Sequence, residues 1–384
     1  MPINSLFKFL SFSLSLILLM GCQSTKETTL LFVGSYTDKK PGKGIHVYEF
    51  NNDTGETTLK FALDSVTNAS FLKLSKDGKY LYSVMDSQMP YNGKIASFAV
   101  DAAEGKIELI NIEDCGGLNP AHIELDNTET ILTSSQYSDG SLSLFKINKD
   151  GSLNPHSQVL KFKDSSIVEN RQETSHIHSS NFSSDNRFLF VHDLGADKIR
   201  RFHVDSASKD SILQNENQIK MKPGSGPRHF SFHPNGKFGY SLSELSGKIT
   251  AFNYQNDNLN FIEDYASYQQ ELDIYRASDI HISPDGKFLY ASNRGPEEDS
   301  ISMFSIDTTT GKLSLVGYES TYGKHPRNFT LSPCGNFLLV GNQFSGNIVI
   351  FRRNVETGKL TKLPNEIVVD SPSSLQMQTY GVGL

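Results

Sequence analysis

The sequence predicts an all-β protein, a single seven-bladed β-propeller of four-stranded antiparallel blades whose closing blade is shared by N- and C-terminal strands. Two observations predict this fold. A strand–turn–strand unit recurs at a spacing of roughly fifty residues, which is typical of repeat architectures. The strand-like runs left over at the two ends of the chain together make one further unit.

Each copy of the unit has two runs of alternating apolar and polar residues joined by a turn rich in Gly, Asn and Asp, which indicates antiparallel strands. A second pair of alternating segments, such as KITAFNY and LNFIEDY, follows, so every unit has four strands. The copies read FLKLSKDGKYLYSVMD from Phe71, HIELDNTETILTSSQ from His122, SSNFSSDNRFLFVHDL from Ser179, HFSFHPNGKFGYSLSE from His229, DIHISPDGKFLYASNR from Asp279 and NFTLSPCGNFLLVGNQ from Asn328.

The closing blade is predicted from what surrounds these copies. Three strand-like runs, LLFVGSY, GIHVYEF and TTLKFAL, precede the first copy, and SSLQMQTYG follows the last. A blade built from both ends closes the ring without an exposed sheet edge. An open β-solenoid is the alternative, although it does not need the two ends to supply parts of one unit. The chain contains no Trp, which excludes the WD-repeat version of the fold.

The N-terminus indicates export. We expect residues 1–21 to be a lipoprotein signal peptide, residues 22–29 a tether and residues 30–384 the propeller domain. The sequence LMGC resembles a lipobox, in which Cys22 becomes the acylated first residue; a plain signal peptide is the alternative. The apolar run is shorter than the roughly 20 residues of a membrane helix. The expected location is therefore the periplasm or cell surface, through a lipid anchor.

Composition and missing motifs exclude several classes of function. The chain has 36 basic and 43 acidic residues and no basic run, so we expect no nucleic-acid partner, and we expect a monomer. Cys115 and Cys334 lie in different repeats, so no structural disulfide is expected. The chain lacks GxSxG, HExxH and GxxxxGK motifs. We expect no cofactor and no transition metal; calcium bound by loop carboxylates is an alternative.

The copies diverge into charged and polar residues at two positions, the start of the first strand and the end of the second. In a propeller blade both positions lie at the same mouth of the central channel. Unpaired charges are costly there, so a ring of them indicates an anionic or polarised ligand. An alternative is that Arg228 and Glu244 simply pair and join two blades. The diverging residues include His122, His178, Arg228, His229, Asp279 and Arg327 at strand starts, and Glu244 and Arg294 at strand ends.

The segments GPRHFSFHPNGKFGYSLSEL, SDIHISPDGKFLYASNR and PRNFTLSPCGNFLLVGNQ, with LFVGSYT and NPAHIELD, resemble the bacterial 6-phosphogluconolactonase and lactonase family of seven-bladed propellers. The resemblance covers nearly all of the chain after the leader. It implies hydrolysis of a sugar-acid lactone, with an active site similar to the His, two Arg and Glu of the related fungal carboxymuconate-lactonising enzymes. Matched by motif, the implied catalytic residues are His178, Arg228, Glu244 and Arg294, and we expect His122, His229, Asp279 and Arg327 to complete a substrate-binding rim.

The expected mechanism is non-covalent and activates water beside the bound lactone. His178, with an unperturbed pKa of about 6.5, is the expected base. Glu244 beside two arginines is expected to stay ionised and to orient water or His178. Arg228 and Arg294 are expected to hold the lactone carbonyl or an anionic substrate group.

The sequence is compatible with several alternatives. In ETSHIHSSNF, His176 precedes His178, so either is a candidate for the functional histidine, although His176 and His325 are expected to be solvated. The resemblance is to a cytosolic sugar-phosphate enzyme, whereas the leader indicates export. The reaction type therefore transfers better than the substrate. A binding propeller without turnover and a muconate-lactonising cycloisomerase are the alternative functions.

Overall fold

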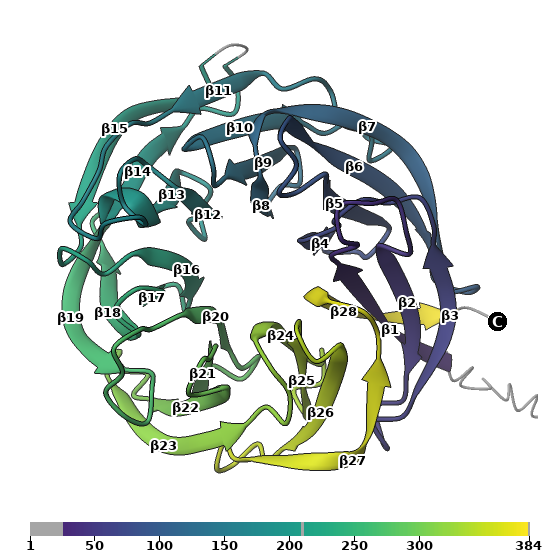
Figure 1. The fold of residues 1–384 in the computed structure, drawn as a ribbon. Helices are drawn as coiled ribbons and strands as arrows, with labels where there is room; N and C mark the ends of the chain where they lie inside the picture. Colours follow the sequence, from purple (N-terminus) through teal and green to yellow (C-terminus); the bar gives the residue numbers. More distant parts are fainter. Residues whose placement is uncertain (1–25, 209–210, 383–384) are drawn as a thin grey trace, which may run out of the picture.

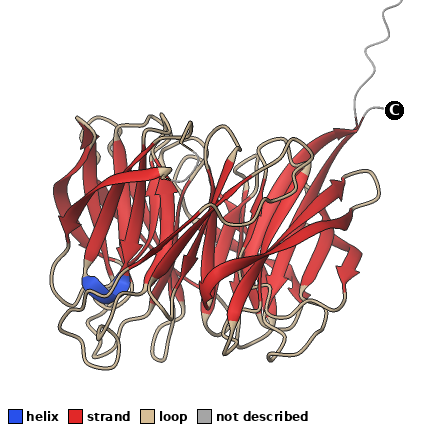
Figure 2. Cartoon of the chain, turned by 90° about the horizontal axis from the view of Figure 1, so that it is seen from above, coloured by secondary structure: helices blue, strands red, loops and turns tan. Residues whose placement is uncertain are grey.

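The computed structural model describes residues 26–208 and 211–382 and confirms the seven-bladed propeller (Figure 1). Seven four-stranded antiparallel sheets surround a central channel, with one strand of each sheet innermost. Seen from the side, the strands run across a disc and the loops gather at its two faces (Figure 2). The predicted signal peptide and Cys22 lie outside the described residues. Within residues 26–208 and 211–382, no helix has the length and apolar character that crossing a bilayer requires.

Each blade consists of four strands in order from the channel to the outer surface. From the innermost to the outermost strand, the blades are β28 (Pro372–Val382), β1 (Lys26–Ser35), β2 (Ile45–Phe50) and β3 (Thr57–Leu63); β4 (Leu72–Leu74), β5 (Tyr80–Met85), β6 (Asn92–Asp101) and β7 (Lys106–Leu118); β8 (Pro120–Leu125), β9 (Ile131–Gln136), β10 (Ser141–Lys146) and β11 (Gln158–Lys161); β12 (Ile177–Phe182), β13 (Phe188–Asp193), β14 (Lys198–Val204) and β15 (Leu213–Lys220); β16 (Pro227–Phe232), β17 (Phe238–Ser243), β18 (Lys248–Gln255) and β19 (Asn258–Ala266); β20 (Ala277–Ile282), β21 (Phe288–Asn293), β22 (Ser300–Ile306) and β23 (Leu313–Ser320); β24 (Pro326–Leu331), β25 (Phe337–Asn342), β26 (Asn347–Arg353) and β27 (Leu360–Val368). One 3-10 turn, η1 (Leu194–Ala196), interrupts the β structure.

The closing blade joins the two ends of the chain as predicted, with β28 pairing antiparallel to β1. The predicted boundary at residue 30 is wrong, because β1 begins at Lys26 and residues 26–29, expected in the tether, pair with the end of β28. Thr29 and Thr379 also share a side-chain hydrogen bond of 2.8 Å. The reason is that β28 extends to Val382 and offers backbone partners to residues whose own polar sequence does not indicate a strand.

The repeated turn explains why the six copies align so well. The turn residue between the first two strands has a positive φ in every copy, a conformation that favours Gly and Asn. In one copy, Ser283 Oγ donates to Asp285 Oδ1 at 2.5 Å and accepts from the backbone N–H of Phe288 at 3.0 Å. The positive-φ residues are Gly78, Glu129, Asn186, Gly236, Gly286 and Gly335.

Neighbouring blades are joined by a repeated tyrosine contact. The buried hydroxyl of Tyr290 donates to the carbonyl of Gly358 at 2.8 Å, in a turn of the next blade. Tyr240 makes the same contact with Gly311 at 2.9 Å. Apolar clusters fill the remaining space between blades, and each large side chain buried there stabilises the fold by about 1.5–3 kcal/mol. Of the described cysteines, Cys115 is buried and Cys334 is exposed, and both are free thiols.

A β-bulge lies at the start of the innermost strand in five consecutive blades, β8, β12, β16, β20 and β24. In β16 the register shifts between Pro227 and His229, so that Arg228 is the extra residue. A bulge turns a side chain out of the regular alternation. As a result Arg228 and His229, although consecutive, both line cavities of the channel, at different depths. The bulges therefore position the residues of the mouth.

Candidate active site

The four predicted catalytic residues meet at one mouth of the channel. A cavity of about 150 Å³ is lined by His178, Arg228, Glu244 and Arg294, and also by Arg327. His178 and Arg228 stand on the bulges of β12 and β16. Glu244 follows β17 directly, and Arg294 follows β21. Circular closure of the sheets thus brings together residues that are distant in the sequence.

Glu244 is the centre of this group. Its Oε2 accepts hydrogen bonds from Arg228 Nε and Arg294 Nη2, each at 2.9 Å, and its Oε1 accepts one from Arg171 Nη2 at 2.6 Å. The carboxylate is 7% exposed and Arg228 is 2% exposed. The alternative that Arg228 and Glu244 pair is therefore correct as a contact, but the pair also lines the cavity.

The electrostatics of the mouth follow from this contact. Burial opposes ionisation of Glu244, yet the charges of Arg294, Arg228 and Arg171 outweigh it and hold its pKa well below the usual range. Burial, and then the neighbouring Arg294, lower the pKa of Arg228, which still stays protonated at neutral pH. Two arginines more, Arg276 and Arg327, line the adjoining cavity of about 460 Å³. Five arginines around one carboxylate leave the mouth with a large excess of positive charge.

His178 is neutral in this setting. Its side chain is 5% exposed, and its Nδ1 is buried without a hydrogen-bond partner among the described residues. Burial, followed by the charge of Arg228, holds its pKa well below the ordinary histidine value. His178 lines the cavity, whereas His176 stacks on the ring of Tyr137 with centroids 4.4 Å apart. Of the two histidines, only His178 therefore faces Arg228 and Glu244 in the cavity.

Arg171 and His325 are two residues of the mouth that were missed from the sequence, in addition to Arg276. Arg171 lies in the long connection between β11 and β12, outside every repeat, so no comparison of copies could identify it. His325 was expected in a solvated turn, but its Nε2 accepts from Arg294 Nη1 at 3.3 Å and its ring stacks on Phe344. Both residues reach the cavity from loops and not from blade strands.

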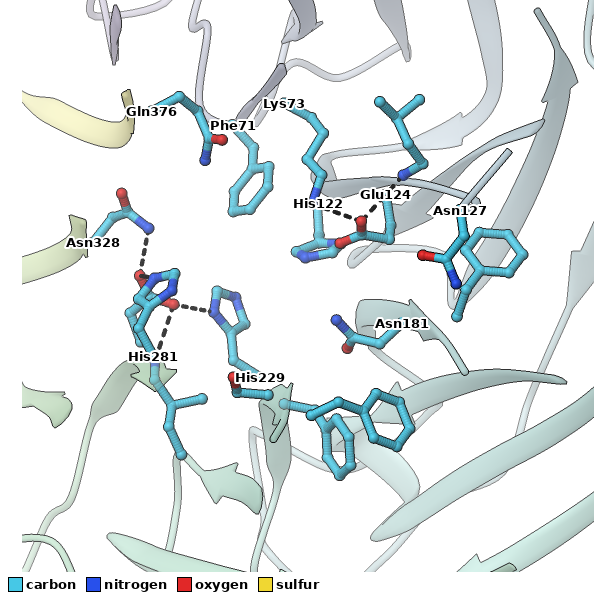
Figure 3. A pocket seen from close by; sticks show the side chains of 17 residues that line it. Phe71, Lys73, His122, Glu124, Asn127, Asn181, His229, His281, Asn328 and Gln376 are labelled. Atoms are coloured by element: carbon cyan, nitrogen blue, oxygen red, sulfur yellow. Dashed lines mark hydrogen bonds and ion pairs between the residues drawn. The ribbon is translucent and has the colours of Figure 1, made fainter. Parts of the chain in front are cut away.

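Arg327 lies where the sequence predicts, whereas three other predicted rim residues do not. His122, His229 and Asp279 line a second cavity of about 280 Å³, deeper in the channel (Figure 3). The predicted position at the rim is wrong for a local reason. His122 and His229 come one residue after the bulge of their strand, and Asp279 is the last residue of its bulge, so all three face the channel below the mouth. His178 and His229, with ring centroids 5.2 Å apart, lie at the boundary between the two cavities.

The described residues offer no resident metal site. Within residues 26–208 and 211–382, no three His, Cys, Asp or Glu side chains gather in an arrangement that holds a metal ion. The cation-rich mouth instead suits an anionic or polarised organic ligand, since guanidinium groups match carboxylate and phosphate geometry.

The fold and the mouth define a seven-bladed propeller with a cation-rich site at one end of its channel. A sequence profile described as "Lactonase, 7-bladed beta-propeller" matches residues 30–377, so the chain belongs to this lactonase family. It is 58% identical over 351 residues to a 6-phosphogluconolactonase of Formosa agariphila, covering 91% of this chain and 99% of that protein. It is 30% identical over 345 residues to the 6-phosphogluconolactonase of Bacillus subtilis, covering 89% and 96%.

The solved structures agree with this assignment. The periplasmic gluconolactonase of Pseudomonas aeruginosa superposes with a TM-score of 0.86 at 31% identity. The superposition covers 92% of this chain and 99% of that one. The family resemblance found in the sequence is therefore confirmed, together with the fold that it implied.

Proposed function

We propose that this protein hydrolyses a sugar-acid lactone at the mouth of its channel. The observation that carries the proposal is the clamp of three arginines on Glu244 beside the cavity-lining imidazole of His178. Membership of the lactonase family and the names of the relatives, 6-phosphogluconolactonase and gluconolactonase, support the same reaction. A lactonase opens a cyclic ester with water, which needs a base and a group that stabilises the oxyanion.

His178 is the proposed base. Because its Nδ1 is the buried nitrogen, Nε2 is the nitrogen left to meet a water molecule in the cavity. Water transfers a proton to Nε2 as its oxygen bonds to the lactone carbonyl carbon. The tetrahedral intermediate then loses the ring oxygen, which takes the proton back from Nε2. His178 returns to its neutral form, and the product is a hydroxy acid.

Arg228 and Arg327 are the proposed substrate-holding groups. Arg228 uses Nε for Glu244 and Nη1 for the carbonyl of Ser278, which leaves Nη2 for the substrate. Arg327 forms no ion pair within the described residues, and its guanidinium lies over the ring of Tyr36, 5.3 Å from the centroid. Hydrogen-bond donors that are already in position stabilise the developing oxyanion most strongly in such a partly enclosed site.

Glu244 and Arg294 are proposed to position the others. Both carboxylate oxygens of Glu244 are taken by arginines, so it orients guanidinium groups instead of water, a change from the role expected from the sequence. Arg294 uses its three nitrogens for Glu244, His325 and the carbonyl of Arg276. It therefore links the blade of β21 to that of β17 and adds positive charge.

The substrate class follows from the charge of the mouth. Five arginines against one carboxylate favour a lactone that carries an anionic group, such as a phosphate or a second carboxylate. The adjoining cavities share Glu244, Arg294 and Arg327, so one sugar-sized ligand can contact both. Because exposed charges are screened by salt, the preference for anionic lactones should weaken as ionic strength rises.

The location that we propose is outside the cytoplasm, through a lipid on Cys22. The leader and its LMGC sequence support this, as does the periplasmic name of a structural relative. Metabolic labelling with an alkyne fatty acid tests the anchor. The label should attach to the wild-type chain and be lost in Cys22→Ala; labelling that survives this change would exclude the anchor.

The activity is tested by acid release at constant pH, with spontaneous ring opening subtracted. The panel contains glucono-δ-lactone, 6-phosphogluconolactone and an open-chain muconate. We expect acceleration of lactone opening, a preference for the phosphorylated lactone at low salt, and loss of activity in His178→Ala. Binding without acceleration would support a binding propeller instead, and conversion of the muconate alone would support a cycloisomerase.

A further inference from the structure

A buried Asp–His pair lies directly behind His178. His229 Nδ1 is 2.7 Å from Asp279 Oδ1, and both side chains are at least nine-tenths buried. The ring of His229 faces the ring of His178 with centroids 5.2 Å apart and an interplanar angle of 66°. The carboxylate, His229 and His178 therefore form a row that leads from the deep cavity to the mouth.

Asp279 is held as an acceptor by its surroundings. Besides His229, it accepts from the backbone N–H of Ile280 at 3.0 Å, from His281 Nε2 at 2.9 Å and from Asn328 Nδ2. In Figure 3, the side chains of His229, His281 and Asn328 lie close together on one side of the cavity. Burial opposes its ionisation, but His281 and His229 hold the pKa of Asp279 well below its usual range. An ionised carboxylate only accepts, so Nδ1 of His229 carries the proton.

This assignment decides the role of the other nitrogens. With the proton on Nδ1, Nε2 of His229 is an acceptor, and it is buried without a partner. Nδ1 of His178 is also buried without a partner. Buried polar atoms that stay unpaired are disfavoured, and because neither nitrogen has a direct partner, one buried water between them satisfies both. In the arrangement in which this water accepts from His178 and donates to Nε2 of His229, the proton of His178 is on Nδ1, and its Nε2 keeps a lone pair toward the cavity.

We propose that Asp279 and His229 are positioning residues that hold His178 in the Nδ1–H tautomer, with Nε2 free to take a proton from water. The kinetic part of this proposal rests on the proposed function, whereas the tautomer does not. No proton passes to Asp279, because the proton taken by Nε2 returns to the leaving ring oxygen. Asp279 and His229 keep the imidazole of His178 oriented while that ring gains and then loses a proton.

The neighbouring histidines differ from His229 in one respect. His122 packs on Phe71 with centroids 4.5 Å apart, and His192 lies against Phe230. Neither forms a hydrogen bond to a carboxylate within the described residues. His192 lines neither cavity and has both ring nitrogens buried and unpaired, so it is a matched control for the loss of a buried imidazole.

Two substitutions of His229 separate its two nitrogens. In His229→Asn the side-chain amide reaches only the position of Nδ1, so the variant keeps the hydrogen bond to Asp279 and loses the link to His178. In His229→Gln the carbonyl reaches toward the Nε2 position and can accept from His178. We expect His229→Asn to lower kcat by about 10- to 100-fold with KM little changed, and His229→Gln to recover most of the rate. His192→Asn and His192→Gln should both keep the wild-type kcat.

Long-range ¹H–¹⁵N NMR spectra of the full chain at pH 7 test the tautomer without turnover, with the His178 signal assigned from His178→Gln. We expect Nδ1–H for His178 in the wild type and in His229→Gln, and loss of this form in His229→Asn. An Nε2–H tautomer in the wild type, or equal kcat in the two His229 variants, would overturn the proposal. If no lactone is turned over, the proposed function fails and the spectra alone decide the positioning role.

Discussion

Arg228 and Arg294, from neighbouring blades, donate to the same oxygen of Glu244 at equal distances of 2.9 Å. Two guanidinium groups of like charge are thus held close together by one carboxylate, with Arg171 on its other oxygen. Glu244, Arg228 and Arg294 are buried, so their charges are poorly screened by solvent. Blade packing and substrate binding therefore depend on the same group of residues. Substitutions of some of these residues should lower activity, and substitutions of others should lower stability.

Arg228→Ala is expected to lower kcat for a sugar lactone by about 10²–10³-fold, the usual effect of removing one fixed oxyanion donor. The reason is that Arg228 lines the cavity together with His178, and its Nη2 is not used by Glu244 or Ser278. Initial rates of acid release, corrected for spontaneous opening, measure the change. Arg187→Ala is the control, because Arg187 is exposed and pairs with Asp185 and Asp257 far from the mouth. Unchanged turnover in Arg228→Ala would remove the assignment.

Glu244→Gln is expected to destabilise the fold by about 3–5 kcal/mol, because it leaves buried arginines without their counter-charge. Denaturant unfolding of the variant and of the wild type gives the difference. Inorganic phosphate should raise the Tm of the variant more than that of the wild type, since an anion at the mouth restores the missing charge. Glu263→Gln, at an exposed pair with Lys312, should change neither value. A variant as stable as the wild type would contradict the role of Glu244 as the counter-charge.

The fold could be predicted almost completely from the sequence, because the turn chemistry repeats in every blade. Positive-φ residues such as Gly286 fix the turn, and the alternation around it fixes the strands. The limit was the N-terminal boundary. Residues 26–28 pair only with β28, which is a contact between the two ends of the chain that local pattern does not encode.

Part of the site could be predicted from the sequence, but the depth at which each residue lies in the channel could not. Divergence between copies identified His178 and Arg228, since both stand at a bulge that faces the mouth. The same argument placed His229 at the rim, although alternation beyond the bulge sends it into the deeper cavity. Arg171 lies outside the repeat, so the third arginine on Glu244 had no sequence signal at all.

The pH profile of activity tests the environment of His178. Burial and then the charge of Arg228, with Arg327 among the further causes, lower the pKa of His178. The active neutral form therefore persists well below pH 6.5, and the acid limb of kcat/KM should lie well below that pH. Arg327→Gln removes one of these positive charges, so the pKa of His178 rises and the acid limb moves to higher pH. A wild-type acid limb centred near pH 6.5 would contradict the lowered pKa of His178.

The pH dependence of stability tests the buried histidines independently of catalysis. Burial lowers the pKa of His192 to about 3, so between this value and about 6.5 the unfolded chain binds a proton that the folded chain does not. Its effect is absent above about pH 6.5, and stability is lost as the pH falls below that value, by up to about 1.4 kcal/mol per pH unit. The stabilisation that Glu244 and Asp279 contribute is lost only at lower pH, because their pKa values are depressed in the folded state and lie near 4 in the unfolded state.

The window between pH 7 and pH 5 therefore isolates the histidines. His192→Gln should flatten the plot of unfolding free energy against pH there by up to about 1.4 kcal/mol per pH unit, since it removes one of the groups that titrate only on unfolding. Equilibrium denaturation in urea at half-unit pH steps measures the slope. His203→Gln is the matched control because His203 is exposed on the outer part of its blade, and its slope should equal that of the wild type. If His192→Gln and the wild type had the same slope, His192 would bind protons equally in the folded and unfolded chain, and burial would not lower its pKa.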